Sequence, residues 1–180
     1  MPDIGKLLWP KSVAVIGASS DTHILRGRVF EIIRSHPFAG AIYPVSRSAA
    51  EVQGLKAYPS IDALPEPVDM VWTSQNYHDL HNFPGLDVGI FNKLVFDDLK
   101  PGGIYLVLDH RAEAGSGGRD TKTLHRIDPE TVKKEVQAAG FVFVAASDLL
   151  HQPGDDHSLK VFDPAVRGKT DQFILKFRKP

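Results

Sequence analysis

The segment Ser12-Val-Ala-Val-Ile-Gly-Ala-Ser-Ser20 decides the fold of this chain of 180 residues. Its first part, up to Ile16, is rich in β-branched and apolar side chains, which is typical of a strand buried on both faces of a parallel sheet. The glycine and the small residues after it predict a sharp turn. A strand, a tight turn and a helix in this order open a doubly wound α/β domain.

An amphipathic helix is predicted directly after this turn. Its apolar side chains fall at i, i+4, i+7 and i+8, and they are Leu25, Val29, Ile32 and Ile33. The helix is expected to end before Pro37. The turn is therefore expected to lie at the N-terminus of this helix.

The rest of the chain continues the alternation. Further strands are predicted at residues 41–45, 55–58, 69–73, 104–108, 141–144 and 171–178, and further helices carry apolar residues at 91–99 and 132–139. Because a long loop rather than a helix precedes the last strand, we expect that strand to run antiparallel to its neighbour. The sequence therefore predicts one α/β domain, residues 1–180, with a Rossmann-like, doubly wound, mostly parallel sheet and helices on both faces.

Composition and charge exclude several classes of function. The chain has 21 basic and 22 acidic residues and a formal net charge of -1, so no general attraction for nucleic acid or an anionic membrane is expected. It has no cysteine, which excludes disulfides, thiolate metal sites and a catalytic cysteine. No apolar run approaches the roughly 20 residues that cross a bilayer, and the first residues lack the apolar core of a signal peptide. We expect a cytoplasmic protein with a small-molecule nucleotide ligand, and the sequence predicts no particular oligomeric state.

The turn after the first strand is the leading candidate for a ligand site. Gly17 and Ala18 let the backbone approach a ligand closely, and Ser19 and Ser20 offer hydroxyl groups and amides where a helix dipole favours phosphate. Arg26, in the first turns of the predicted helix, adds positive charge. The segment is not the G-x-G-x-x-G motif, which disfavours a dehydrogenase. The alternative is a tight turn without a ligand, beside an ordinary surface arginine.

A second loop belongs to the same predicted site. It contains Val45, Ser46 and Arg47, where doubly wound folds contact the ribose of a nucleotide. No acidic residue is present there to bind a vicinal diol, which argues against NAD. An arginine at this place suits a phosphorylated ribose, and the alternative is again ordinary surface.

Polar side chains also follow the predicted strands at 69–73 and 104–108. His78 and His81 have the spacing H-x-x-H, which on a helix could direct two imidazoles at one metal ion, but the sequence places no third ligand and no metal site is predicted. Asp109 and His110 could form a general base oriented by a carboxylate. The G-x-S-x-G motif of a nucleophilic serine is absent, and no catalytic residue is predicted.

The N-terminal part of the chain, about residues 6–70, resembles a known family. The resemblance rests on stretches such as Lys11-Ser-Val-Ala-Val-Ile-Gly-Ala-Ser-Ser20, Ala41-Ile-Tyr-Pro-Val45, Glu51-Val-Gln-Gly54 and Ala57-Tyr-Pro-Ser60. These are similar to the CoA-binding domain of NDP-forming acyl-CoA synthetases. The resemblance implies that 17–20 and 45–47 bind the nucleotide end of CoA, with Ser46-Arg47 in place of the Asn-Pro that is common in that family.

The remaining part, about residues 72–180, resembles the C-terminal half of a class I SAM-dependent methyltransferase, from a group of predicted methyltransferases. The stretches that carry this resemblance include Asn76-Tyr-His-Asp-Leu-His81, Leu99-Lys-Pro-Gly-Gly103, Thr123-Leu-His-Arg-Ile-Asp128 and Gly168-Lys-Thr-Asp171. The half of such an enzyme that holds SAM is missing, together with its glycine-rich turn and the acidic residue after its second strand. SAM is therefore the less expected cofactor.

The two resemblances meet at the predicted fourth strand without overlapping, which suggests a chimera of two Rossmann-like halves, residues 1–71 and 72–180. We expect an engineered or recombined chain, without catalysis, that retains binding of CoA or another adenine nucleotide. The alternatives are a SAM-dependent methyltransferase and a chain that folds but binds no ligand.

Overall fold

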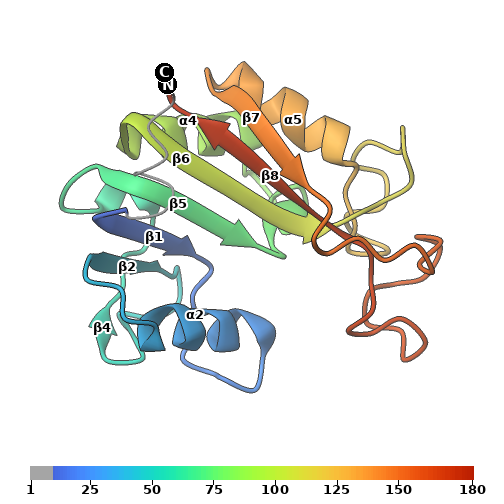
Figure 1. Ribbon diagram of the computed structural model, residues 1–180, viewed down its shortest axis with the longest axis horizontal. Helices are drawn as coiled ribbons and strands as arrows, with labels where there is room; N and C mark the ends of the chain where they lie inside the picture. Colours follow the sequence, from blue (N-terminus) through green and yellow to red (C-terminus); the bar gives the residue numbers. More distant parts are fainter. Residues whose placement is uncertain (1–9) are drawn as a thin grey trace.

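A six-stranded sheet forms the centre of the computed structural model, which describes residues 10–180 (Figure 1). Its strands lie in the order β2-β1-β5-β6-β8-β7. Their bounds are β1 (Ser12–Ile16), β2 (Ala41–Val45), β5 (Val68–Ser74), β6 (Leu99–His110), β7 (Val142–Ser147) and β8 (Gln172–Arg178). The pairs β1–β2, β1–β5 and β5–β6 are parallel, whereas β8 runs antiparallel to β6 and β7. The predictions of a mostly parallel sheet and of an antiparallel last strand are confirmed.

Helices cover both faces of this sheet. Their bounds are α2 (Leu25–Ser35), η1 (Ile61–Ala63), α3 (Tyr77–Leu80), α4 (Val88–Asp98) and α5 (Pro129–Ala138). On one face, Phe30 of α2 packs in a cluster with Val13 and Val15 of β1. On the other face, Val95 of α4 and Val136 of α5 belong to a larger cluster. This cluster contains strand residues such as Ala14, whose side chain points to the face opposite to that of Val13 and Val15. The Rossmann-like class with helices on both faces is confirmed.

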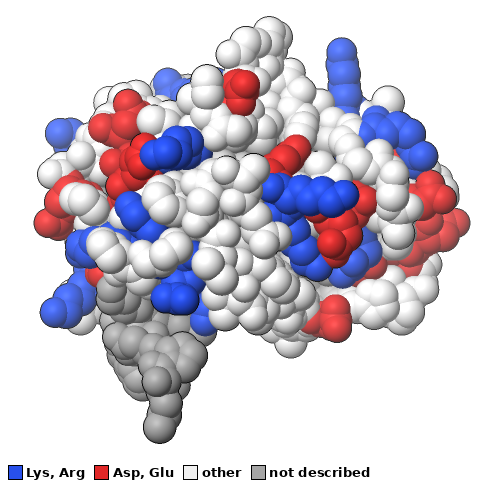
Figure 2. Space-filling view, turned by 90° about the horizontal axis from the view of Figure 1, so that it is seen from above, with Lys and Arg blue, Asp and Glu red and all other residues white. Residues whose placement is uncertain are grey.

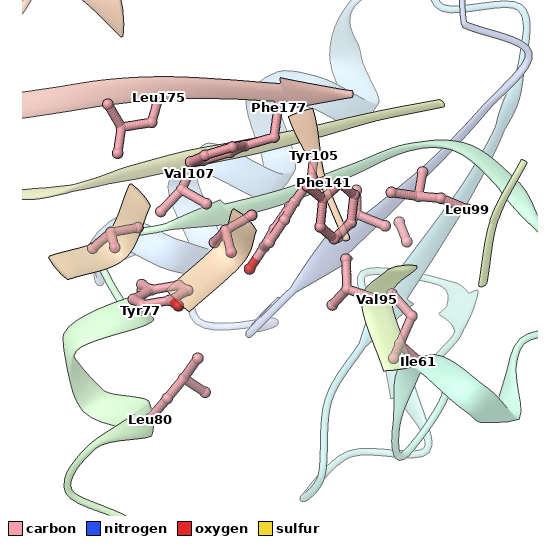
Figure 3. Close-up of a cluster of buried hydrophobic side chains, with 14 of the residues drawn as sticks. Ile61, Tyr77, Leu80, Val95, Leu99, Tyr105, Val107, Phe141, Leu175 and Phe177 are labelled. Atoms are coloured by element: carbon pink, nitrogen blue, oxygen red, sulfur yellow. The ribbon is translucent and has the colours of Figure 1, made fainter. Parts of the chain in front are cut away.

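The larger cluster fills the space between the sheet and helices α4 and α5 (Figure 3). The ring of Tyr105 lies 5.5 Å from that of Phe141 and 6.4 Å from that of Phe177, measured between centroids. Full burial of a large apolar side chain stabilises the fold by about 1.5–3 kcal/mol. Because Ala14 of β1 belongs to the same cluster, this core contains residues of both predicted halves.

Helix α2 ends as predicted, but its buried face differs from the predicted stripe. Phe30 is fully buried and Ile33 packs in the same cluster, whereas Ile32 is 56% exposed. An aromatic ring buries more apolar area than an isoleucine, so Phe30 sets the rotation of the helix about its axis.

The predicted strand at 55–58 does not join the main sheet as a strand. Its first residues form β4 (Leu55–Lys56), which pairs antiparallel with β3 (Glu51–Val52). The turn between them has positive φ at Gln53 (49°) and Gly54 (83°), as in a two-residue hairpin turn. Tyr58 makes a single parallel bridge to the end of β2. A hairpin thus replaces the expected third strand.

Strand β6 begins at Leu99, in a segment predicted to end a helix. Leu99 pairs with Val68 of β5, and the register shifts between Val68 and Met70. The side chain of Leu99 is 1% exposed and lies in the larger cluster. Its burial favours the sheet, so α4 ends one residue earlier, at Asp98.

Charged side chains of both signs are interspersed on the face that Figure 2 shows, in agreement with the formal net charge of -1. This face therefore offers no broad surface of a single sign. Within residues 10–180, no helix combines the length and the apolar character that spanning a bilayer requires.

Candidate functional site

The carboxyl ends of the parallel strands β2, β1, β5 and β6 form one edge of the sheet. β1 lies between β2 and β5, so the strand order reverses there. In doubly wound folds, ligands bind at this edge beside such a reversal. The segments that reach it follow Ile16, Val45, Ser74 and His110.

Gly17 forms the turn after β1, and two features of the structure require a residue without a side chain there. Its φ is +78°, in the left-handed region, and a Cβ atom would lie 2.3 Å from Nδ2 of Asn76. That Nδ2 donates to the carbonyl oxygen of Ile16 at 3.1 Å, and Oδ1 of Asn76 accepts from Oγ1 of Thr73. The amide of Gly17 donates to the carbonyl oxygen of Val45 at 3.0 Å. The structure thus brings the two predicted loops together.

Ser19 and Ser20 lie in a loop before α2, not at the N-terminus of that helix. α2 begins at Leu25, because the residues after Ser20 form a turn in which Oδ1 of Asp21 accepts from the amide of His23 at 2.9 Å. The prediction that the helix dipole supports these serines is therefore wrong, since that effect is confined to the first turn. Within residues 10–180, the backbone amides of Ser19 and Ser20 donate to no protein acceptor.

Gln53 ties this loop to the β3–β4 hairpin. Its side-chain amide donates to the carbonyl oxygens of Ser19 at 3.1 Å and Gly27 at 2.9 Å, and its backbone amide donates to Oγ of Ser20 at 3.2 Å. Sequence reasoning missed this residue. The glycine after it, which marks a hairpin turn, is the signal that could have pointed to it.

Three further residues of the predicted site, Ala18, Val45 and Ser46, are buried or half-buried. Ala18 and Val45 are 4% and 6% exposed, so their side chains pack into the core instead of facing a ligand. Ser46 is half-buried, and its amide donates to the carbonyl oxygen of Tyr58 at 2.8 Å. That bond fixes the path of the chain between β2 and Arg47.

The two predicted arginines are both exposed. Arg26 lies in the first turn of α2. Arg47 follows β2 at the carboxyl edge, and its guanidinium carbon lies 4.2 Å from the ring centroid of Phe83, which follows α3. This contact orients Arg47 at the edge.

An open hollow of about 440 Å³ lies next to the loop that contains Ser19 and Ser20. The residues that line the hollow are Thr22, Glu31, Arg34, Ser35 and Gln53. It contains none of the predicted ligand residues. Gln53 contacts both the hollow and the loop, so the predicted site lies beside the hollow rather than inside it.

A second polar group lies where β5 and β6 end. His78, on α3, is 3% exposed, and its Nδ1 lies 2.8 Å from Oδ1 of Asp109. Asp109 is fully buried, and its carboxylate also accepts from the backbone amides of His78 and His110, at 2.7 Å each. Burial lowers the pKa of His78, but the carboxylates of Asp109 and Asp79 outweigh it and raise that pKa to about 10.

Asp79 and His125 complete this group around Nε2 of His78. That nitrogen lies 3.3 Å from Oδ1 of Asp79 and 3.3 Å from Nδ1 of His125. Nδ1 of His125 and Oδ1 of Asp79 are 3.7 Å apart. Burial lowers the pKa of His125, which favours its neutral form. Sequence reasoning missed His125, which lies far along the chain from α3.

His81 does not join His78, contrary to the geometry that the H-x-x-H spacing suggested. Its Nε2 lies 3.3 Å from Oε2 of Glu135 on α5, and the hydroxyl of Tyr77 donates to the same oxygen at 3.0 Å. α3 is a single turn and ends at Leu80, with His81 as its C-cap. The imidazole of His78 therefore contacts Asp109, whereas that of His81 contacts Glu135.

The predicted pairing of Asp109 with His110 is also wrong. Nδ1 of His110 lies 2.9 Å from Oγ1 of Thr170, and burial lowers the pKa of His110 to about 4. The carboxylate of Asp109 instead faces His78. Successive residues of a strand point to opposite faces of the sheet, which separates the two side chains.

The loop that carries His125 is anchored by its next residue. Arg126 is fully buried, and its guanidinium donates to both oxygens of Asp155, at 2.8 and 3.1 Å. It also donates to the carbonyl oxygen of Arg111 at 3.0 Å. Burial raises the pKa of Asp155, but hydrogen bonds from the amide of Asp171 and from Arg126 outweigh it and lower that pKa overall.

Comparison with known proteins gives a sequence match for the N-terminal part. Residues 11–81 match the family described as CoA binding domain. The chain is 43% identical to acetate–CoA ligase [ADP-forming] II of Archaeoglobus fulgidus over 70 residues, which are 39% of this chain and 10% of that protein. It is 43% identical over 61 residues to the alpha subunit of acetate–CoA ligase [ADP-forming] II of Pyrococcus furiosus, 34% of this chain and 13% of that one. The chain thus spans only about a tenth of these relatives.

The match to the CoA-binding family supports the resemblance predicted for about residues 6–70, with one difference. It continues to residue 81 and therefore includes β5 and α3. The segment after β5, with Asn76 and His78, thus belongs to both resemblances, so they overlap.

Solved structures similar to the whole chain include the [4+2]-cyclase SpnF, with a TM-score of 0.60 at 18% identity, covering 94% of this chain and 74% of that one, and several methyltransferases. The N-methyltransferase NodS of Bradyrhizobium japonicum has a TM-score of 0.60 at 13% identity, covering 95% of this chain and 86% of that one. A SAM-dependent methyltransferase of Mesorhizobium loti has a TM-score of 0.55 at 14% identity, covering 99% and 93%. At such identities the similarity shows the fold alone. The chain therefore combines an N-terminal sequence similar to CoA-binding domains with a fold similar to that of these structures.

Proposed function

We propose that this chain binds the nucleotide end of CoA, or a related adenine nucleotide, at the carboxyl edge between β1 and β2, and that it does not transfer methyl groups. One observation carries the proposal. The backbone amides of Ser19 and Ser20, within the segment similar to CoA-binding domains, donate to no acceptor within residues 10–180. Amides of this kind in a turn form a favourable site for a phosphate.

The hydroxyl groups of the same loop fit a phosphate as well. Oγ of Ser19 accepts from the amide of Asp21, and Oγ of Ser20 accepts from the amide of Gln53. Each hydroxyl therefore keeps its own hydrogen for donation to an anion. The amide of Asn76 covers Gly17 itself, so the ligand approaches the serines and not the glycine.

Arg47 is the residue that favours a nucleotide with a phosphorylated ribose, such as CoA, over one with a free ribose diol, such as SAM. It lies exposed after β2, where doubly wound folds contact the ribose, and no acidic side chain stands beside it in the sequence Val45-Ser46-Arg47. A guanidinium at this place favours a phosphorylated ribose over a free diol. CoA carries such a phosphate, whereas SAM carries a free diol. This difference supports CoA over SAM.

We further infer that the chain is a chimera, engineered or recombined, whose halves join at or shortly after β5. The CoA-binding match ends at residue 81, whereas the methyltransferase-like fold extends over the whole chain. The fold similarity is the specific observation that favours the alternative, a SAM-dependent methyltransferase.

Calorimetric titration of the full chain with CoA, dephospho-CoA and SAM tests the proposal. We expect CoA to bind most tightly, and Arg47→Ala to weaken CoA binding by about tenfold, the value of one charge-assisted contact, while leaving dephospho-CoA unaffected. Arg178→Ala is the matched control, because Arg178 is an exposed arginine at the opposite end of the sheet. Tighter binding of SAM than of CoA, or no binding of any of the three, would overturn the proposal.

A further inference from the structure

Three side chains outside the proposed nucleotide site, His78, Asp79 and His125, place one possible ligand atom each within 4.8 Å of one another. Nε2 of His78 and Oδ1 of Asp79 come from α3, and Nδ1 of His125 comes from the loop before α5. The three atoms form a triangle with sides of 3.3, 3.3 and 3.7 Å. Imidazole nitrogen and carboxylate oxygen are common ligands of zinc.

Two sides of this triangle match the ligand spacing of a tetrahedral ion, and the third side is longer. With metal–ligand bonds of about 2.0–2.1 Å, the ligands of a tetrahedral site lie roughly 3.3–3.4 Å apart, whereas neighbouring ligands of an octahedral site lie roughly 3.0 Å apart. The observed sides are 3.3 Å or longer. The spacing therefore favours Zn²⁺ over Mg²⁺.

Asp109 supports His78 in the way expected of a metal-binding histidine. Its buried carboxylate lies 2.8 Å from Nδ1 of His78, so that ring nitrogen has a partner and Nε2 is directed at Asp79 and His125. A carboxylate on the second nitrogen fixes the orientation of the ring and makes it a stronger ligand. The backbone amides of His78 and His110 hold that carboxylate in turn.

His125 occupies a backbone conformation that the rest of the fold must maintain. Its φ is 57°, in the left-handed region, which is uncommon for residues other than glycine. Its ring lies 4.9 Å from that of Phe162, and the next residue, Arg126, is held by Asp155. Strained backbone of this kind is concentrated at functional sites, because the strain persists only where the structure requires it.

The triangle is accessible from one side. The side chain of His78 is 3% exposed, but those of His125 and Asp79 are 24% and 41% exposed. An ion can therefore enter from solvent, and a fourth ligand can approach from the same side. A zinc site with three protein ligands and one open position is the arrangement found in catalytic centres.

We propose that His78, Asp79 and His125 bind Zn²⁺, with the fourth position open to water or to a small anionic ligand. The proposal is independent of the nucleotide site. The competing explanation needs no metal: a charged His78 imidazolium would bridge the carboxylates of Asp79 and Asp109.

Spectroscopy of the full chain with Co²⁺ as the probe separates these explanations. After treatment with a chelator and removal of the chelator, one equivalent of Co²⁺ should give the intense visible bands of a tetrahedral ion, and Zn²⁺ should abolish them. His125→Asn should weaken Co²⁺ and Zn²⁺ binding by on the order of 100-fold. Asparagine tolerates positive φ, so this variant removes the ligand atom without new backbone strain.

His81→Asn is the matched control. It makes the same substitution in the same region, but His81 contacts Glu135 and not the triangle, so its Zn²⁺ affinity should equal that of the unchanged chain. Circular dichroism of each variant checks that it folds, and Asp79→Asn provides a second loss of a ligand at an exposed position. Absence of the tetrahedral bands, unchanged Zn²⁺ affinity in His125→Asn, or an equal loss in His81→Asn would overturn the proposal.

Discussion

Gly17 is the residue at which the turn after β1 meets the segment after β5, and its substitution tests that contact. A Cβ atom there would lie 2.3 Å from Nδ2 of Asn76, which is held by Ile16 and Thr73. Gly168 has the same φ of +78°, but a Cβ atom there would meet no other atom within 4 Å, so Gly168→Ala measures the backbone strain alone. We expect Gly168→Ala to lower the free energy of unfolding by about 1 kcal/mol. Gly17→Ala should lower it by about 2–4 kcal/mol, because displacing Asn76 adds an overpacking cost.

Urea unfolding of both variants measures this difference. Equal losses would mean that Asn76 moves aside freely, so that the contact between the two segments contributes nothing to stability.

At the scale of single residues, Gly17 and the meeting of its turn with Val45 could be predicted from the sequence, because a glycine between a buried strand and small residues requires a turn. His125 could not, because its place depends on positive φ and on the buried pair of Arg126 and Asp155.

At the scale of whole elements, two N-caps of similar chemistry should differ in their contribution to stability. Asp87 caps α4 by accepting from the amide of Ile90 at 3.0 Å, and it is exposed. Asp128 caps α5 by accepting from the amide of Glu130 at 2.9 Å, and its second oxygen accepts from the amide of Gly115 at 2.9 Å. Asp128 is also 4% exposed, so its loss leaves partly buried amides without a partner.

Replacement of each cap by alanine therefore has a graded expected outcome. Asp87→Ala should lower the free energy of unfolding by about 1 kcal/mol, the usual value of an exposed cap. Asp128→Ala should lower it by about 2–4 kcal/mol, since it removes a cap and also leaves the amide of Gly115 without a partner. Thermal or chemical denaturation compares them, and a loss in Asp87→Ala equal to or larger than that in Asp128→Ala would contradict this account.

Regular elements were predictable where local pattern and burial agree. β1, β2 and the end of α2 follow the apolar pattern of the sequence. The segment 55–58 has strand-like residues, but the turn at Gln53-Gly54 pairs its start with β3 instead. Leu99 fits a helical pattern, but its burial places it in β6. In the first case an adjacent hairpin turn decided the outcome, and in the second case burial in the core did; the apolar periodicity of each segment records neither.

At the scale of the whole molecule, the long segment between β7 and β8 is held by buried carboxylates rather than by regular structure. Asp155 pairs with the buried Arg126, and the carboxylate of Asp171 lies 3.0 Å from each of His151, His157 and Arg111. The pKa of Asp155 and that of Asp171 are both lowered, because hydrogen bonds to each carboxylate outweigh the effect of its burial. The segment therefore depends on these groups staying ionised.

This dependence predicts how stability changes with pH. A carboxyl group whose pKa is lower in the folded state than its ordinary value of 3.8 contributes stability that is complete above that value and is lost as the pH falls toward the folded pKa.

Asp155→Asn removes this contribution and leaves the buried Arg126 unpaired, so it should lower the free energy of unfolding at pH 7 by about 3–5 kcal/mol. The difference between the unchanged chain and Asp155→Asn should stay constant from pH 8 to about pH 5 and shrink below about pH 4, because protonation then removes the charge from Asp155 in the unchanged chain as well. Denaturant titrations at several pH values measure both free energies. A difference that stays constant down to pH 3 would show that the charge of Asp155 does not hold the segment, and that the substitution acts through the shape of the side chain alone.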